Sequence, residues 1–469
     1  MLSEHISSQI YIKICFQPTL SQKKCIEKLS FFLSEGGSDS IFILNGYAGT
    51  GKTTLVAALV ATLKELKINT ILLAPTGRAA KVLSQYSSKK ATTIHKHIYR
   101  EKTNASYESK FSLSPNRDAD TLFIIDEASM LSDSSGDKLF GSGSLLEDLV
   151  SYVRSGKRCR MMFVGDSAQL PPVGSDFSPA LDEIFMSRYG DVHYSLLDEV
   201  VRQGEESGIL FNATMVRCML ENSLIEIPHF EMDFPDFKAI EGGEFSELLQ
   251  DCYDKYGCDE TIIITRSNKR ANRYNEGVRR YSRWAEEVIE SGDNLMVVRN
   301  NYHYTERIKD CPMGFIANGD TAQLKRIRRF EELYGFQFAQ AVLSFGDYND
   351  TEIECRILLD TLSSESPSLT YEQSQRLFYE IEKDFLDIKS RMKRLELIRS
   401  TPHYNALQVK FAYAVTCHKA QGGEWSAVFV DRCLFGDERM TPDMMRWLYT
   451  ALTRATKMVY IVNFDERFF

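Results

Sequence analysis

A glycine-rich turn between an apolar run and a helical run decides the fold class of this chain. It reads IFILNGYAGTGKTT and covers residues 41–54. Four positions match the phosphate-binding pattern GxxxxGK followed by Ser or Thr, namely Gly46, Gly51, Lys52 and Thr53. Glycines let backbone N–H groups turn inward around phosphate oxygens, and the start of the following helix adds partial positive charge. The stretch therefore predicts a nucleotide site at the end of a strand.

The polar groups of this loop have distinct expected contacts. Lys52 is expected to reach the β- and γ-phosphates, and the hydroxyl of Thr53 is expected to ligate Mg²⁺. The remaining contacts would come from the loop backbone. The predicted nucleotide-binding residues of the loop are Gly46, Tyr47, Ala48, Gly49, Thr50, Gly51, Lys52, Thr53 and Thr54.

Two adjacent acids end another apolar run and complete the predicted site. In Ile124-Ile125-Asp126-Glu127 the acids lie at the carboxyl end of a buried strand, where parallel sheets bind ligands. Asp126 would join the Mg²⁺ shell, and Glu127 would orient and deprotonate the attacking water. Gln169 follows a further strand and can sense the γ-phosphate. Because the water-activating acid directly follows the metal acid, hydrolysis fits better than phosphoryl transfer to a small metabolite.

Short apolar runs recur along the chain, each followed by a turn and a helical pattern. Runs this continuous in Ile, Leu and Val are typical of strands buried on both faces, as in a parallel sheet covered by helices. The alternation predicts an α/β fold. The runs lie at 41–44, 70–74, 121–125 and 161–164, and again at 261–264, 411–415, 427–430 and 458–462.

Two segments interrupt this alternation. Residues 101–120 are polar and contain no long apolar run. Between 299 and 405 the chain is irregular, with a turn at Asn318-Gly319 before two alternating runs at 321–327 and 338–343. Alternating runs joined by turns predict a small antiparallel barrel.

A helical pattern follows the expected barrel. From residue 371 to 399, apolar residues such as Leu377, Ile381 and Met392 recur three or four apart, which predicts a helix packed on its own domain rather than a partner-binding helix. Residues 346–399 do not map onto a simple barrel. The predicted division is a first α/β domain at 1–205 with an insertion at about 96–120, a second at 206–300 plus 405–469, and an inserted barrel and helical segment at 301–404.

The composition is that of a soluble globular protein and excludes several classes. At 469 residues the chain is too long for one ordinary domain, and no apolar run approaches the roughly 20 residues of a membrane span. The net charge of −9 argues against a nucleic-acid coat but allows a local basic groove. Scattered cysteines without a CxxC pair indicate reduced thiols, and residues 1–10 lack a signal pattern, so a cytoplasmic protein is expected.

Eight motifs, in chain order, carry a resemblance to a known family. They are GYAGTGKTT, APTGRAA, TIHK, DEASM, GDSAQLPPVG, VVRQ, YAVTCHKAQGGEW and YTALTRA. In this order they resemble the superfamily 1 helicases, and among these the RecD and phage Dda-like group, whose members move 5′ to 3′ on single-stranded DNA. The resemblance spans Gln22 to Arg454. It implies two RecA-like domains with ATP in the cleft between them, an inserted pin in the first domain and a Src-homology-3-like barrel in the second.

The resemblance also implies roles for single residues outside the loop. Gln22 corresponds to the glutamine that reads adenine. Arg202 and Arg454 correspond to arginine fingers from the two sides of the cleft, where a planar cation stabilises charge on the γ-phosphoryl group. Gly422 and Glu424 would contact the nucleotide from the second domain, Glu424 at the ribose.

The expected DNA contacts lie at strand-to-helix turns, which suit a phosphate. Aromatic residues near the pin, Tyr99, Tyr107 and Phe111, could stack on a base at the duplex junction or belong to the core of that segment. His95 and His97 are two positions apart, which points them to different helix faces and argues against a metal pair. The predicted DNA-binding residues are Pro75, Thr76, Arg78, Thr93, His95, His418 and Lys419.

These observations favour one function over two others. The leading interpretation is an ATP-dependent DNA helicase that uses ATP and Mg²⁺ and acts as a monomer on single-stranded and tailed duplex DNA. The main alternative is an ATP-gated nucleic-acid-binding remodeller without processive unwinding. A P-loop kinase of small metabolites is disfavoured because it would not need a second RecA-like half. The chain has no long N-terminal extension of the RecD type and ends at Phe469, so no accessory partner domain is expected.

Overall fold

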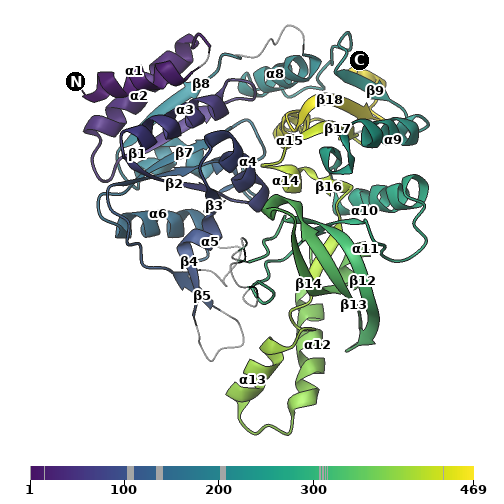
Figure 1. The fold of residues 1–469 in the computed structure, drawn as a ribbon. Coiled ribbons are helices and arrows are strands. Elements are labelled where there is room, and N and C mark those ends of the chain that lie inside the picture. The colour runs from purple at the N-terminus through teal and green to yellow at the C-terminus, as the bar shows by residue number, and fades with distance from the viewer. Residues whose placement is uncertain are drawn as a thin grey trace.

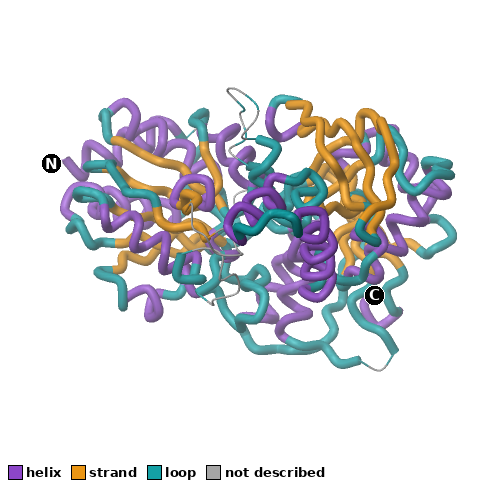
Figure 2. The backbone as a smooth tube through the Cα atoms, turned by 90° about the horizontal axis from the view of Figure 1, so that it is seen from below, coloured by secondary structure: helices purple, strands orange, loops and turns teal. Residues whose placement is uncertain are grey.

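The protein forms two α/β domains, a barrel and a helical hairpin that projects from the barrel (Figure 1). Seen from below, the strands gather in two separate groups, one on the side of each chain end (Figure 2). In the part of the chain that the structure describes, no helix is long and apolar enough to cross a membrane. The computed structural model describes residues 2–14, 16–102, 110–133, 141–200, 207–305, 308, 311, 313, 315–436 and 438–469.

The first domain is a parallel sheet in the order β3-β2-β6-β7-β1-β8. Its central strands are buried on both faces because alternate residues enter different cores: Phe42 and Leu44 pack on one side, Ile41 and Ile43 on the other. The strands are β1 (Ile41–Gly46), β2 (Asn69–Ala74), β3 (Ala91–Thr93), β6 (Thr121–Ile125), β7 (Arg160–Gly165) and β8 (Val192–Leu197). The helices are α1 (Leu2–Lys13), α2 (Leu20–Glu35), α3 (Lys52–Glu65), α4 (Gly77–Ser87), α5 (Ile94–Ile98), α6 (Leu145–Ser155) and α7 (Glu183–Ser187).

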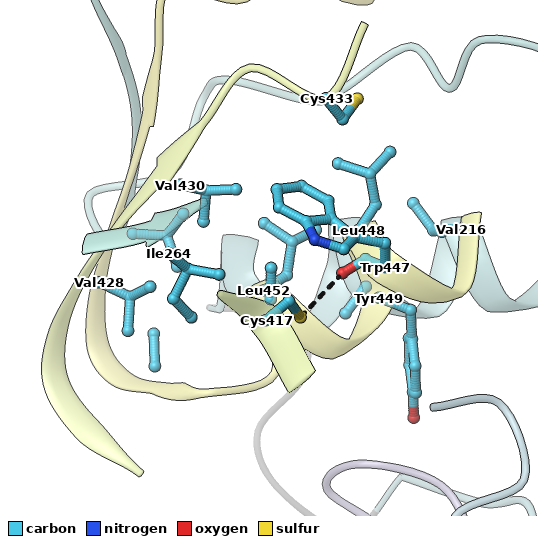
Figure 3. Close-up of a cluster of buried hydrophobic side chains, with 14 of the residues drawn as sticks. Val216, Ile264, Cys417, Val428, Val430, Cys433, Trp447, Leu448, Tyr449 and Leu452 are labelled. Carbon is cyan, nitrogen blue, oxygen red and sulfur yellow. Dashed lines mark hydrogen bonds between the residues drawn. The ribbon is translucent and has the colours of Figure 1, made fainter. Parts of the chain in front are cut away.

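The second domain is also a parallel sheet, in the order β16-β10-β17-β18-β9. In its core, Leu448 and Leu452 pack against Ile264 and Val428, and the Cys417 thiol donates to the Trp447 carbonyl at 3.6 Å (Figure 3). The strands are β9 (Phe237–Ile240), β10 (Thr261–Thr265), β16 (Ala414–Thr416), β17 (Trp425–Asp431) and β18 (Ala455–Val462). The helices are α8 (Gly208–Glu221), α9 (Phe245–Tyr256), α10 (Asn268–Gly277), α14 (Cys417–Ala420) and α15 (Pro442–Leu452). Both sheets confirm the predicted α/β class.

The predicted barrel is present and closed. Its strands pair antiparallel except for a short parallel pairing of β14 with β15. The apolar run at 411–415, predicted as one strand, is divided: Phe411 ends a barrel strand and Ala414 begins a strand of the second sheet. The predicted inserted segment at 301–404 is therefore too short, because the first and last strands of the barrel lie at 294–297 and 407–411. The strands are β11 (Asn294–Val297), β12 (Thr321–Leu333), β13 (Phe336–Phe345), β14 (Thr351–Leu358) and β15 (Leu407–Phe411).

The helical pattern at 371–399 forms a hairpin of two helices, α12 (Tyr371–Glu382) and α13 (Arg391–Ser400), after a short α11 (Asp360–Ser363). Leu377 and Ile381 pack against the barrel, as the pattern predicts, whereas Met392 is exposed. The periodicity breaks because the chain reverses between the helices. A smaller hairpin of β4 (Tyr99–Lys102) and β5 (Lys110–Leu113) lies at the predicted pin.

Candidate active site

The phosphate-binding loop joins β1 to α3 and has the backbone that its glycines predict. Gly49 and Gly51 have φ of 77° and 81°, a left-handed conformation that favours glycine. The loop is further closed by the Thr50 hydroxyl, which donates to the Tyr47 carbonyl at 2.8 Å. Thr53 is exposed in the first turn of α3. Hydroxyl and carboxylate oxygens are the ligands Mg²⁺ prefers, and a helix N-terminus suits phosphate, so these residues fit Mg²⁺ and a nucleotide.

Lys52 is held over this loop. Its ammonium donates to the carbonyl of Gly46 and, at 2.9 Å, to the carbonyl of Tyr47. Both acceptors belong to the loop that would surround the phosphates. The ammonium therefore lies at the predicted phosphate site.

Gln22 is buried beneath the loop rather than presented to a base. Its amide nitrogen donates to the Thr50 carbonyl at 2.9 Å, and its amide oxygen accepts from the Thr19 backbone at 3.1 Å. The second bond belongs to a capping box at the start of α2. The amide therefore supports the loop, and its predicted reading of adenine stays a prediction.

The two acids lie at the carboxyl end of β6, beside the loop. Asp126 accepts hydrogen bonds from the Tyr86 hydroxyl and, at 2.9 Å, from the Glu127 backbone. Burial raises the pKa of Asp126, and burial together with the Asp126 charge raises the pKa of Glu127 to about 7, against the lowering effect of Arg454. Glu127 also has φ of 51°, which is strained for a residue other than glycine. Strain and raised pKa values of this kind gather at active sites.

The second domain contributes a buried cation to these acids. Arg454 lies at the end of α15 and is 4% exposed, with a guanidinium nitrogen 4.0 Å from Glu127 Oε1. It donates to the carbonyls of Thr450 at 3.2 Å and Gly423 at 3.3 Å, which fix its direction. Glu127 and Arg454 thus lie together although they come from two domains, and the role of Arg454 as an arginine finger stays a prediction.

Gly422 lies against the first domain. A β-carbon there would come within 3.0 Å of Ala79 and 3.3 Å of the Thr76 hydroxyl, and φ is 72°, so glycine is required. The carboxylate of Glu424 is exposed, and its predicted contact with the ribose stays a prediction.

Gln169 occupies the interface between the domains. It is 5% exposed, and its amide oxygen accepts no hydrogen bond from any residue that the structure describes. Its neighbour Leu170 is held from the second domain, because the backbone N–H donates to the Thr450 hydroxyl at 2.9 Å and the carbonyl accepts from Gln421 at 2.7 Å. A buried amide oxygen without a donor costs about 1–3 kcal/mol, which suits a group that changes partners during a cycle.

Two tyrosines that sequence reasoning did not assign belong to this site. Tyr449 points out of its own core (Figure 3), donates to Asp166 at 2.7 Å and accepts from the Ala48 backbone at 2.8 Å. Tyr86 donates to Asp126. Tyr449 is the first residue of the YTALTRA motif, so the motif could have identified it as a site residue. Tyr86 lies outside all eight motifs, and no sequence pattern indicates its role.

The predicted DNA contacts are dispersed. Thr76 and Thr93 use their hydroxyls to cap α4 and α5, accepting from Ala79 and Lys96. Arg78 donates to the Glu424 carbonyl at 2.8 Å and stacks on Trp425, 4.0 Å from its ring centre. All three side chains make contacts within the protein, so their roles toward DNA, and that of half-buried Pro75, stay predictions.

The basic groups of the predicted DNA site are partly buried. Burial lowers the pKa of His95 to about 4 and lowers the pKa of His418. Burial and the nearby Lys410 lower the pKa of Lys419 to about 8, so this lysine is a cation at neutral pH. Arg202, the other predicted arginine finger, lies outside the described residues.

The pin hairpin contacts the segment leading into the barrel. The Phe111 ring contacts the Tyr302 ring at a tilt of 33°, with 4.6 Å between ring centres, and Tyr302 stacks on Phe315 with 4.7 Å between ring centres. Tyr99 is buried and donates to Asp148 at 2.6 Å, so it belongs to the core, as one of the two interpretations predicts. Tyr107 lies outside the described residues.

The two parallel sheets define the class of protein, because one carries the phosphate loop and acid pair and the other supplies a buried arginine. It is a P-loop NTPase with two RecA-like domains. The AAA domain model matches residues 22–214, and the UvrD-like helicase C-terminal domain model matches residues 411–462. These two matches support the resemblance to superfamily 1 helicases of the RecD and Dda type that the motifs carry.

Several known proteins are similar to this chain. An uncharacterized protein of Acanthamoeba polyphaga mimivirus is 22% identical and covers 93% of this chain and 98% of its own length. The ATP-dependent DNA helicase dda of Enterobacteria phage T4 is 32% identical over 37% of each chain. The ATP-dependent RecD2 DNA helicase of Deinococcus radiodurans is 28% identical over 33% of this chain, which spans 19% of that protein. The Bacteroides Pif1 helicase structure with ADP-AlF3 and ssDNA has 15% identity and a TM-score of 0.49, covering 96% of this chain and 92% of that one.

Proposed function

We propose that this protein is an ATP-dependent DNA helicase that moves 5′ to 3′ along single-stranded DNA and separates duplex DNA. The observation that carries the proposal is the pairing of Glu127 with Arg454 across the two domains, 4.0 Å apart and largely buried. A site assembled from two domains exists only when they are closed. Nucleotide binding and hydrolysis can therefore open and close the cleft, which is what translocation needs.

The residues of the site have separate roles in the proposed ATP hydrolysis. Lys52, Thr53 and the loop backbone hold the phosphates, and Thr53 with Asp126 would hold Mg²⁺, which when bound neutralises phosphate charge. Glu127 orients the attacking water and accepts its proton. Arg454 stabilises the charge that gathers on the γ-phosphoryl group. Gln169 and Tyr449 transmit the change in the bound nucleotide from this site to both domains.

The test is strand displacement on duplexes with a 5′ or a 3′ single-stranded tail. We expect displacement only with the 5′ tail, only with hydrolysable ATP, and accompanied by ATPase stimulation by oligonucleotides. Displacement from the 3′ tail alone would reverse the proposed polarity. Stimulated ATPase without displacement on either substrate would instead identify a nucleotide-gated remodeller.

A matched pair of variants shows that any displacement comes from this site. Glu127→Gln should abolish displacement, whereas Glu396→Gln, on the exposed face of α13, should leave it unchanged. Gel filtration of the protein with and without DNA tests the proposed monomer, which should elute near the 53.6 kDa of one chain.

A further inference from the structure

Helix α4 touches the barrel at its first residues. A β-carbon at Gly77 would overlap the Asp320 carboxylate and the Tyr348 hydroxyl, so the barrel lies directly against the start of the helix. One turn later, the Lys81 ammonium lies 2.9 Å from the Asp347 carboxylate of the barrel. The barrel therefore holds α4 through a close steric fit and an ion pair.

The same turn of α4 contacts the second domain. Arg78 donates to the Glu424 carbonyl at 2.8 Å, and its guanidinium lies over the Trp425 ring. Arg78 and Lys81 are also on the helix face that lines a cavity of about 410 Å³ where the first domain, the second domain and the barrel meet. The N-terminal half of α4 is thus in contact with both the barrel and the second domain.

The other end of α4 reaches the predicted metal site. Tyr86, in the last turn, donates its hydroxyl to one carboxylate oxygen of Asp126. The other oxygen of Asp126 accepts from the Glu127 backbone at 2.9 Å. Two donors therefore fix the rotation of the carboxylate, and one of them belongs to α4.

The helix between these ends can transmit a displacement. Leu83, Ala79 and Ala80 pack into the core of the first domain along its length. Gly77 and Tyr86 are separated by nine helical steps, roughly 14 Å at 1.5 Å per residue. A hydrogen-bonded helix of this length moves as a unit, so a shift of its first turn also displaces the Tyr86 hydroxyl.

We propose that Tyr86 is a positioning residue for Asp126 and that α4 transmits to it the position of the barrel and the second domain. Partners of metal ligands of this kind orient the ligand, and their loss typically lowers metal affinity by 10–100-fold. The proposal rests on the proposed function in one respect: Asp126 takes part in holding Mg²⁺ beside the nucleotide. It adds a physical route by which the barrel and the second domain change hydrolysis.

The experiment measures the Mg²⁺ concentration that half-saturates tight binding of a fluorescent ADP analogue to the full chain. Tyr86→Phe removes only the hydroxyl, so this concentration should rise by about 10-fold. Binding of the analogue without Mg²⁺ should stay the same, because the loop and Lys52 are unchanged. Tyr379→Phe, which removes an exposed hydroxyl on α12, is the matched control and should behave as wild type. An unchanged Mg²⁺ requirement in Tyr86→Phe would overturn the positioning role.

A second variant tests transmission. Lys81→Ala removes the ion pair with the barrel and should also shift the Mg²⁺ requirement, but not when Tyr86 is already Phe. Additive effects in the double variant would overturn transmission through Tyr86, because independent sites add. These readouts involve no strand displacement. If the protein binds nucleotide with Mg²⁺ but separates no duplex, the proposed helicase function is wrong, whereas the positioning role of Tyr86 still stands.

Discussion

The hydroxyl of Tyr449 donates a 2.7 Å hydrogen bond to the carboxylate of Asp166, although 283 positions separate these residues in the chain. The same hydroxyl accepts from the Ala48 backbone of the phosphate loop at 2.8 Å. One buried atom of the second domain thus connects two motifs of the first. Its place suits a group that reports nucleotide occupancy to the second domain.

Tyr449→Phe should weaken the coupling between nucleotide and DNA. The variant leaves the Ala48 N–H and one oxygen of buried Asp166 without a partner in the closed form, at a cost of about 1–3 kcal/mol. The closed form then forms less readily, so the difference in DNA affinity with and without a non-hydrolysable ATP analogue should shrink by about 10-fold. Fluorescence anisotropy on a labelled oligonucleotide measures it. Tyr281→Phe, an exposed tyrosine, is the control, and equal differences in the two variants would contradict the role of the hydroxyl.

Glu127→Gln and Lys52→Ala should separate hydrolysis from binding. Glutamine keeps the size of Glu127 but cannot accept a proton from water, so turnover should fall by at least about 100-fold while ATP still binds. Lys52→Ala removes a phosphate contact, so binding and turnover should fall together. Isothermal titration with ATP and a phosphate-release assay measure the two quantities. Rapid turnover by Glu127→Gln would show that another group activates the water.

The sequence could predict those parts of the site in which the residues of a short motif determine their own backbone conformation or position in the fold. The phosphate loop is one, because Gly49 and Gly51 adopt conformations that few other residues tolerate. The acid pair is another, because it directly ends a buried strand. Arg454 was predictable only through the resemblance, since its neighbour Glu127 is distant in the chain.

Other features depend on contacts that no local pattern encodes. Gln22 is a helix-capping residue because Thr19 and Thr50 are both within reach. Arg78 meets Trp425 only after two domains come together. The barrel strand at 294–297 contains an apolar run as continuous as that of the sheet strand at 261–265, so its pattern does not reveal which sheet it joins. The fold class follows from the sequence, whereas these pairings follow from tertiary packing.

Lys419→Ala should reduce the dependence of single-stranded DNA binding on salt and on pH. Each phosphate contact contributes a slope of about −0.7 in log K against log salt, so the slope should become shallower by about that amount. Because the pKa of Lys419 is lowered to about 8, its charge is present below pH 8 and lost above it. Wild-type affinity should therefore fall between pH 7 and 9 more than that of the variant. Lys393→Ala, on exposed α13, is the control, and parallel salt and pH profiles for Lys419→Ala and wild type would exclude a phosphate contact.

Asp320→Asn should change how stability depends on pH. Burial, reinforced by the nearby Asp347 charge, raises the pKa of Asp320 to about 7, whereas an unfolded aspartate titrates near 4. Between these values the folded chain binds more protons than the unfolded chain, so the contribution of Asp320 to stability is lost as pH rises from about 4 to 7 and is constant above. The side chain of asparagine does not titrate in this range, so it makes no such pH-dependent contribution.

The measurement is the thermal unfolding midpoint of wild type and variant at several values between pH 5 and 8. Relative to wild type, Asp320→Asn should gain stability as pH rises, on the order of 2 kcal/mol over this range. Its one side-chain oxygen can still accept from the Ala317 backbone, which donates to one Asp320 oxygen at 2.7 Å. Its amide nitrogen would replace the other oxygen, to which the Tyr348 hydroxyl now donates at 3.1 Å, and can donate to that hydroxyl instead. Asp387→Asn, exposed between α12 and α13, should follow the wild-type profile. If the Asp320→Asn profile also runs parallel to wild type, Asp320 is ionised throughout this range and the barrel contact at Gly77 includes a buried charge.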